Sequence, residues 1–168
     1  MTPMVHTSEL IVRYFAKSDI TPEDSWSLLA WCLTKGADEF TVNGLVTGPE
    51  GQKSAAFFAS LAPYERPEAY RRRLSAPTAE EFVRSTPLWD LSTKTIALLR
   101  ETMADGIFDY NVGGDPWIED LAVYRKGEFM MGVLTHEDGG VLRVTGTEVA
   151  ELDGMGFPHK DEVPWVGY

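Results

Sequence analysis

The chain has 168 residues, of which 43% are hydrophobic and 24% charged, and its formal net charge is −11. These values are typical of one globular domain with a single core and argue against a disordered chain. The longest uncharged apolar stretches, 25–34 and 54–64, fall short of the roughly 20 residues that span a bilayer. We therefore expect a single domain, residues 1–168, that does not insert into a membrane.

The negative charge is concentrated in the last third of the sequence. Residues 1–100 carry 12 acidic and 11 basic side chains, whereas residues 101–168 carry 14 acidic and 4 basic ones. Nucleic-acid binding needs basic residues to displace counterions, so this asymmetry argues against DNA or RNA as a partner. It favours a protein partner with a basic surface or a cation, although a negative surface also keeps a small protein soluble.

The single cysteine and the N-terminal residues indicate the cellular compartment of the protein. Cys32 lies in an apolar run and cannot form an internal disulfide, so we expect it to pack in the core. Residues 1–17 show no basic segment followed by an uninterrupted apolar one, and so resemble no secretion signal. The expected location is the cytoplasm.

Helices are predicted over most of the first two-thirds of the chain. Segment 8–17 has apolar residues at helical spacing, although it is also rich in β-branched residues. Thr21 and Pro22 are a typical N-cap and first helical residue, and that helix should end at Lys35-Gly36. Later segments predict a short extended stretch at 40–46, a buried helix or strand at 54–61, short helices at 67–74 and 78–85, and a longer helix at 92–105.

The pattern changes to β in the last third. Segments 121–124, 129–134 and 141–144 are apolar and are separated by turn sequences, which predicts a three-stranded antiparallel meander. A short helix should follow at 145–152, with Thr145 and Glu148 at the spacing of a capping box. The expected fold class is α+β, with a mostly helical N-terminal two-thirds packed on a C-terminal three-stranded antiparallel meander and a short terminal helix.

The segment 105–120 contains five carboxylates and no basic residue. Such a segment can form turns, bind a hard cation such as Mg²⁺, or present a negative face to a basic protein. It has no EF-hand register, and it contains Trp117, an aromatic residue of the kind that anchors interfaces. We hypothesise a partner-binding surface made of Asp109, Asp115, Trp117, Glu119 and Asp120.

A metal site is the alternative use of these carboxylates. His136 is predicted in a hairpin turn and His159 in the C-terminal tail, and a shared His136/His159 site would need the fold to bring them together. Zinc sites usually show closely spaced ligands, as in His-Glu-x-x-His or Cys-x-x-Cys, and neither motif occurs. We therefore expect no metal and no cofactor.

The sequence also contains none of the common catalytic motifs. It has no Gly-x-Ser-x-Gly elbow, no phosphate-binding loop and no dinucleotide-binding glycine motif. The leading hypothesis is a noncatalytic protein-binding domain of the inhibitor, immunity or adaptor type, and the alternative is a small metal-assisted hydrolase with an Asp/Glu/His site. A third hypothesis is a subunit that buries Phe57 and Phe58 against a copy of itself.

Overall fold

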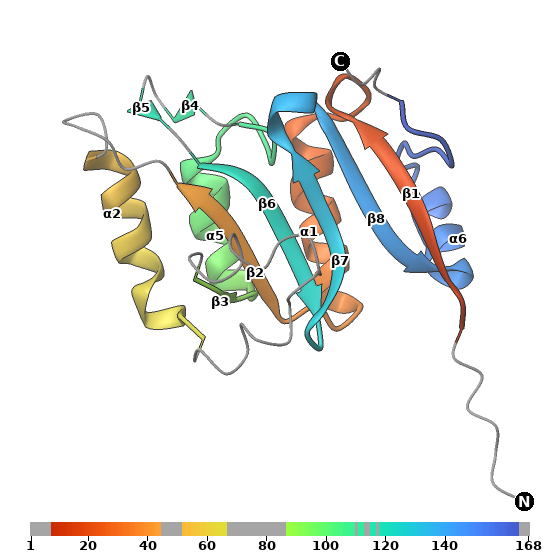
Figure 1. Cartoon of the computed structure of the whole chain (residues 1–168), viewed down its shortest axis with the longest axis horizontal. Helices are drawn as coiled ribbons and strands as arrows, with labels where there is room; N and C mark the ends of the chain where they lie inside the picture. The colour runs from red at the N-terminus through yellow and green to blue at the C-terminus, as the bar shows by residue number, and fades with distance from the viewer. Residues whose placement is uncertain are drawn as a thin grey trace, which may run out of the picture.

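A six-stranded antiparallel sheet forms the centre of the protein, with its strands in the order β1-β8-β7-β6-β2-β3 (Figure 1). The computed structural model describes residues 8–44, 52–66, 87–109, 111–112, 115–116 and 118–164. The strands of this sheet are β1 (Leu10–Ala16), β2 (Glu39–Gly44), β3 (Trp89–Asp90), β6 (Ile118–Arg125), β7 (Glu128–Leu134) and β8 (Gly139–Thr145). Two further strands, β4 (Asn111–Val112) and β5 (Asp115–Pro116), pair with each other.

Helices cover one face of this sheet. In the view of Figure 1, α1, α5 and α6 lie behind it and α2 lies beside β2. The α-helices of the described residues are α1 (Pro22–Thr34), α2 (Gln52–Leu61), α5 (Thr93–Thr102) and α6 (Gly146–Gly154). Three short 3₁₀ helices are η1 (Lys17–Asp19), η3 (Ala62–Tyr64) and η4 (Thr135–Glu137). Within these described helices, none combines the length and the apolar character that a bilayer crossing needs.

The fold predicted from the sequence is wrong in its N-terminal part. Segment 8–17, predicted as a helix, contains β1, which pairs with β8 from Leu10↔Thr145 to Ala16↔Gly139. On the other side of the meander, β2 and β3 extend the sheet beyond β6. The three predicted strands are therefore the middle of a six-stranded sheet and not a separate meander beneath a helical region.

The helix starts follow the capping chemistry of the sequence. The Thr21 hydroxyl accepts the Asp24 N–H at 3.2 Å, and the Asp24 carboxylate accepts the Thr21 N–H at 2.7 Å. The same reciprocal arrangement begins α5 at Ser92 and α6 at Thr145. Segment 54–61, for which a helix or a strand was expected, is helical in α2. The short helices predicted at 67–74 and 78–85 lie outside the described residues.

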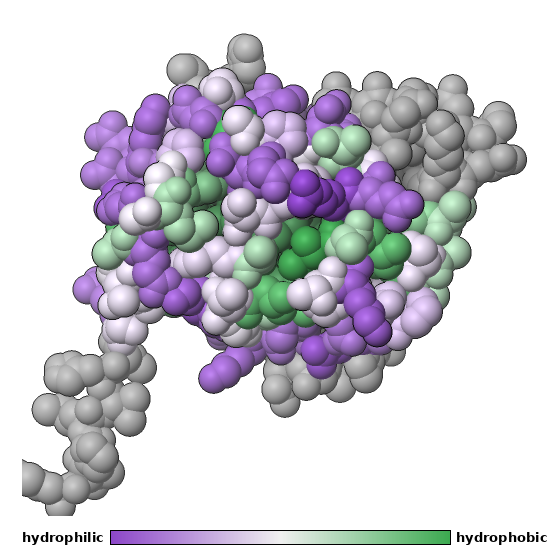
Figure 2. Space-filling model, turned by 180° about the vertical axis from the view of Figure 1, so that it is seen from behind, coloured by the Kyte–Doolittle hydropathy of each residue, from purple (hydrophilic) through white to green (hydrophobic). Residues whose placement is uncertain are grey.

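The core lies between the sheet and the helices. Strand pairing aligns Phe40, Val123, Met131 and Leu142 in one row across four strands, and all four are buried. Seen from behind, the helical layer shows apolar residues between hydrophilic ones (Figure 2). The fully buried Cys32 belongs to this core, and burial raises the pKa of its thiol to about 12. At neutral pH this cysteine is therefore protonated and acts as an apolar packing residue.

Phe57 and Phe58 take part in packing within the chain. Phe57 is buried, and its ring centroid lies 5.4 Å from that of Phe58. The Phe58 ring in turn lies 5.7 Å from Trp89 of β3. These aromatic residues therefore join α2 to the β2–β3 side of the sheet, and the described structure leaves little of Phe57 for contact with a copy of the chain.

Candidate functional site

One end of the sheet collects acidic side chains from distant parts of the sequence. At this end β1 and β7 finish and β6 and β8 begin, and α1 starts there because it follows β1 after η1 (Figure 1). The loop after α5 reaches the same place, since the Ile107 N–H donates to the Ser25 hydroxyl at 3.2 Å. We define the acidic end as the carboxylates of Asp19, Glu23, Asp24, Asp105, Asp109, Glu119, Asp120, Glu137 and Asp138.

Asp109 lies in the loop that follows α5. Its carboxylate accepts the Asp105 N–H at 3.1 Å and so closes a turn of this loop. The loop packs closely on the start of α1, because Gly106 has φ +99° and a Cβ there would lie 2.7 Å from the Ser25 hydroxyl. Asp109 is half-buried, whereas Asp105 is exposed.

Asp120 forms a bulge near the start of β6. The pairing with β2 shifts between Thr41↔Ala122 and Asn43↔Glu119, and Asp120 has a φ of 54°, a left-handed conformation uncommon for residues other than glycine. The Asp120 N–H donates to the Thr135 hydroxyl, and the Thr135 N–H donates to the Asp120 carboxylate, both at 2.9 Å. Two hydrogen bonds thus hold the bulge against η4.

Glu119, the residue before Asp120, contacts a histidine. The Nε2 atom of His136, in η4, lies 2.7 Å from a carboxylate oxygen of Glu119. The Glu119 side chain is 14% exposed and the His136 side chain 68% exposed, so the histidine is the more exposed member of the pair. Protonated His136 would therefore form an ion pair with Glu119.

Replacing Thr135 with valine should reduce the free energy of unfolding by about 1–2 kcal/mol. Valine has nearly the same shape but leaves the Asp120 N–H without its acceptor, and Thr135 is only 3% exposed. The difference would be measured by urea denaturation. The control is Thr147→Val on the exposed side of α6, which should change the free energy by no more than about 0.5 kcal/mol. Equal urea concentrations at the unfolding midpoint for the two variants would contradict the role given to Thr135.

Among the described residues, three cations of lysine and arginine reach the acidic end, and each contacts one of its carboxylates. Lys17 lies 3.4 Å from Asp138, Arg100 2.7 Å from Glu23, and Lys160 3.7 Å from Asp19. These pairs are largely exposed, so each contributes little to stability and neutralises one charge locally. Asp105 and Glu137 are exposed at the same end. The acidic end therefore keeps a clear excess of negative charge.

The structure brings together part of the predicted partner-binding surface. Asp109, Glu119 and Asp120 lie at the acidic end, and each carboxylate contacts a group of the chain itself. Asp115 belongs to β5, but its side chain is outside the described part, as is the whole of Trp117. Sequence reasoning missed Asp19, Glu23 and Asp24, whose only signal was their position in a turn and a first helical turn.

The two histidines of the alternative metal site contact different carboxylates. His136 contacts Glu119, whereas the buried His159 lies 2.9 Å from Asp153 at the end of α6. Among the described residues, no three side chains of the metal-binding types converge. The geometry thus supplies no argument for a shared His136/His159 site.

Comparison of this chain with protein-family models, curated proteins and solved structures found no match. Its function has to be argued from its own residues.

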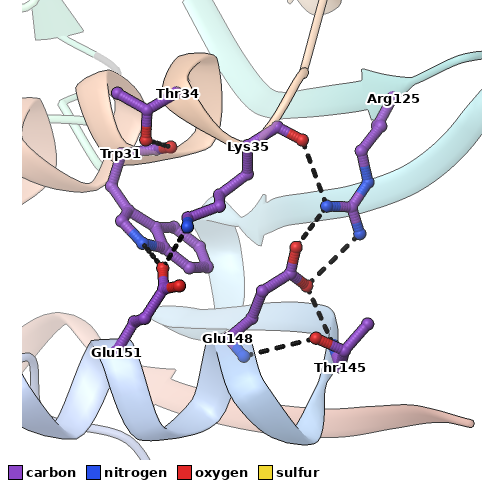
Figure 3. A network of polar contacts seen from close by, with 7 residues as sticks. All are labelled: Trp31, Thr34, Lys35, Arg125, Thr145, Glu148 and Glu151. Carbon is purple, nitrogen blue, oxygen red and sulfur yellow. Dashed lines mark hydrogen bonds and ion pairs between the residues drawn. The ribbon is translucent and has the colours of Figure 1, made fainter. Parts of the chain in front are cut away.

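A second polar network joins three elements at the opposite end of the sheet (Figure 3). Arg125, the last residue of β6, donates to the Lys35 carbonyl at 3.2 Å and binds the Glu148 carboxylate with both of its terminal nitrogens. The Glu151 carboxylate accepts the Trp31 indole N–H at 3.1 Å and pairs with the Lys35 ammonium group. The end of α1, the end of β6 and the start of α6 are thereby held together.

The pKa values of the two glutamates reflect these contacts. Partial burial on its own would raise the pKa of Glu148, but its hydrogen bonds to Arg125 and to the Thr145 backbone outweigh burial and hold the pKa below 4.5. The hydrogen bond from Lys35, followed by that from Trp31, lowers the pKa of Glu151. Both side chains are therefore ionised at neutral pH and act as structural anions.

A buried carboxylate lies on the face of the sheet away from α1. Glu39 of β2 is fully buried, and the Arg66 Nε lies 3.9 Å from it while also pairing with Asp90 of β3. Tyr124 of the neighbouring strand β6 is paired with Glu39, and burial raises the pKa of the Tyr124 phenol. No local sequence pattern pairs these residues, because 24 or more positions separate them. The contacts fix residues after η3 to the edge of the sheet, which is a structural role.

Proposed function

We propose that this protein is a noncatalytic cytoplasmic binding protein, of the inhibitor, immunity or adaptor type, that binds the basic surface of another protein through its acidic end. The proposal rests on one observation: the fold adds Asp19, Glu23 and Asp24 to the acidic stretch of the last third. An excess of one charge at one end of a small domain speeds association with an oppositely charged partner. The proposed contact region also includes Asp115 and Trp117.

The arrangement of the carboxylates favours binding over catalysis. Acid–base catalysis needs side chains placed within reach of one reacting group, often with strongly shifted pKa values. Here the Asp109 and Asp120 carboxylates accept backbone N–H groups, and the exposed Asp105 and Glu137 face water. Such groups supply a negative surface of fixed shape.

A charge-neutralised variant tests the proposal. Asp105→Asn with Glu137→Gln removes two exposed charges from the acidic end without touching the hydrogen bonds of the bulge. The matched control, Glu65→Gln with Glu128→Gln, removes two exposed charges at the opposite end of the sheet. A partner would first be captured from extracts of the native host with the immobilised wild-type protein and identified. Its affinity for all three proteins would then be measured by titration calorimetry at physiological salt.

We expect the acidic-end variant to bind the partner about tenfold more weakly and the control variant to bind like the wild type. The difference should shrink as salt is raised, since screening weakens exposed charges. Equal loss in both variants would show that only net charge matters. No captured partner, or an unchanged affinity of the acidic-end variant, would overturn the proposal.

A further inference from the structure

The outer edge of the sheet carries a short apolar strip. Six large apolar side chains are exposed in the described residues, and three of them are consecutive in β1: Leu10 at 39%, Ile11 at 37% and Val12 at 43%. Within the described residues, β1 is an edge strand of the sheet, and its inner side pairs with β8. Exposed apolar edge strands are templates for pairing with another strand, and proteins that stay monomeric usually protect them.

The backbone of this strip is open to such pairing. At Tyr14 the outer edge exchanges two hydrogen bonds of 2.8 Å with Lys160 of the C-terminal tail. Backbone groups alternate in direction along a strand, so those of Leu10 and Val12 also point outward. Over the described residues, no other segment pairs with this edge. A new strand can therefore join β1 as far as Arg13, where the tail begins to occupy the edge.

The sequence of the strip is complementary to itself. In an antiparallel pair of two copies centred on Ile11, Ile11 faces Ile11 of the second copy and Leu10 faces Val12. A two-fold axis through Ile11 relates the two copies in this register. Glu9 of each copy then lies opposite Arg13 of the other, so that unlike charges face each other twice. Leu10 and Val12, whose backbone groups point outward, then form the hydrogen-bonded pairs that an antiparallel ladder requires. A shift of one residue in either direction separates both charge pairs.

Arg13 makes few polar contacts with the part of the chain that the structure describes. Among the described residues, its buried Nε has no hydrogen-bond acceptor, and its Nη1 lies 4.0 Å from the exposed carboxylate of Asp161. Glu9 is exposed and lies one residue before β1. Opposite charges therefore lie at the two ends of the strip, Glu9 at one and Arg13 at the other.

We infer that two copies of this chain pair through residues 9–13 in an antiparallel register centred on Ile11, which joins their sheets into one. The occupant of the edge is thus a second copy, because the strip is complementary in hydrogen bonding and charge to itself. This contact lies toward the end of β1 that is far from the acidic end, so both surfaces can be used together. Five residues on each side make a small interface, and we expect a dissociation constant in the micromolar range.

A charge-exchange experiment tests the register. Glu9→Arg places two arginines opposite each other in a dimer, and Arg13→Glu places two glutamates opposite each other. Each variant alone should dimerise at least about tenfold more weakly than the wild type. An equimolar mixture of the two should form a heterodimer, because arginine then faces glutamate at both positions. Sedimentation velocity from about 5 to about 300 µM would measure all three samples.

Cross-linking tests the position of the two-fold axis. Opposed residues of a non-hydrogen-bonded pair have Cα atoms about 4.5 Å apart, which suits a disulfide. Ile11→Cys should therefore form a covalent dimer under mild oxidation, whereas Leu134→Cys on β7, where the leucine is 43% exposed against 37% for Ile11, should not. The buried Cys32 does not interfere.

Three results would overturn the inference. One is a wild-type protein that stays monomeric throughout the concentration range. Another is a dimer unaffected by either charge variant, which would place the interface elsewhere. The third is a mixture of the charge variants that associates no better than each variant alone, which would mean that a different register or a different protein occupies the edge.

Discussion

Replacing Gly140 with alanine should lower the free energy of unfolding by about 3 kcal/mol. Gly140 lies in β8 directly opposite Phe15 of β1, and the ring of Phe15 occupies the space that a Cβ would fill. The ring cannot move aside easily, since it is 1% exposed and makes edge contacts with Phe108 and Phe157 at centroid distances of 5.9 and 5.4 Å. Urea denaturation monitored by tryptophan fluorescence would measure the loss.

A matched glycine separates this steric effect from a general effect of alanine. Gly154, at the end of α6, has no heavy atom within 4 Å of an added Cβ, and Gly154→Ala should be neutral or slightly stabilising. Phe15→Leu in the Gly140→Ala background should cost less than Phe15→Leu alone, because the smaller side chain relieves the clash. Strictly additive losses, or a Gly140→Ala variant as stable as Gly154→Ala, would contradict the packing described here.

The burial of Phe15, in a segment whose other residues are exposed or half-buried, also shows why β1 could not be predicted. Leu10, Ile11, Tyr14 and Phe15 have the spacing of a helix, and within this segment only Phe15 is buried. Its strand conformation depends on pairing with β8, about 130 residues later in the chain. Such pairing overrides local preference, whereas the caps at Thr21, Ser92 and Thr145 involve residues three apart and could be predicted.

The candidate site shows the same division between local and long-range information. Asp109, Glu119 and Asp120 could be selected from the sequence because they lie within one acidic segment. The topology, and not the local sequence, places Glu23 and Asp24 at the same end, since α1 starts where β1 finishes. The contact between Glu119 and His136 likewise depends on the bulge at Asp120, whose positive φ has no signature in the sequence.

The network around Arg125 predicts the second large effect, which should depend on pH. Arg125→Met should lower the free energy of unfolding at pH 7 by about 2–3 kcal/mol, because it leaves the Lys35 carbonyl and the poorly exposed Glu148 carboxylate without their donor. The exposed pair Arg100–Glu23 supplies the control, and Arg100→Met should cost no more than about 0.5 kcal/mol.

The direction of the pH effect follows from the pKa of Glu148. In the folded protein this pKa lies below 4.5, its ordinary value in the unfolded chain, so the unfolded state binds the proton first. The stabilisation is therefore complete above pH 4.5 and is lost as the pH falls through the lowered folded pKa. Arg125→Met removes the main group that lowers the pKa. The difference in unfolding free energy between wild type and variant should thus shrink from pH 7 to about pH 3. A difference that stays constant over this range would mean that Arg125 acts through its packing and its bond to Lys35, and not through the Glu148 carboxylate.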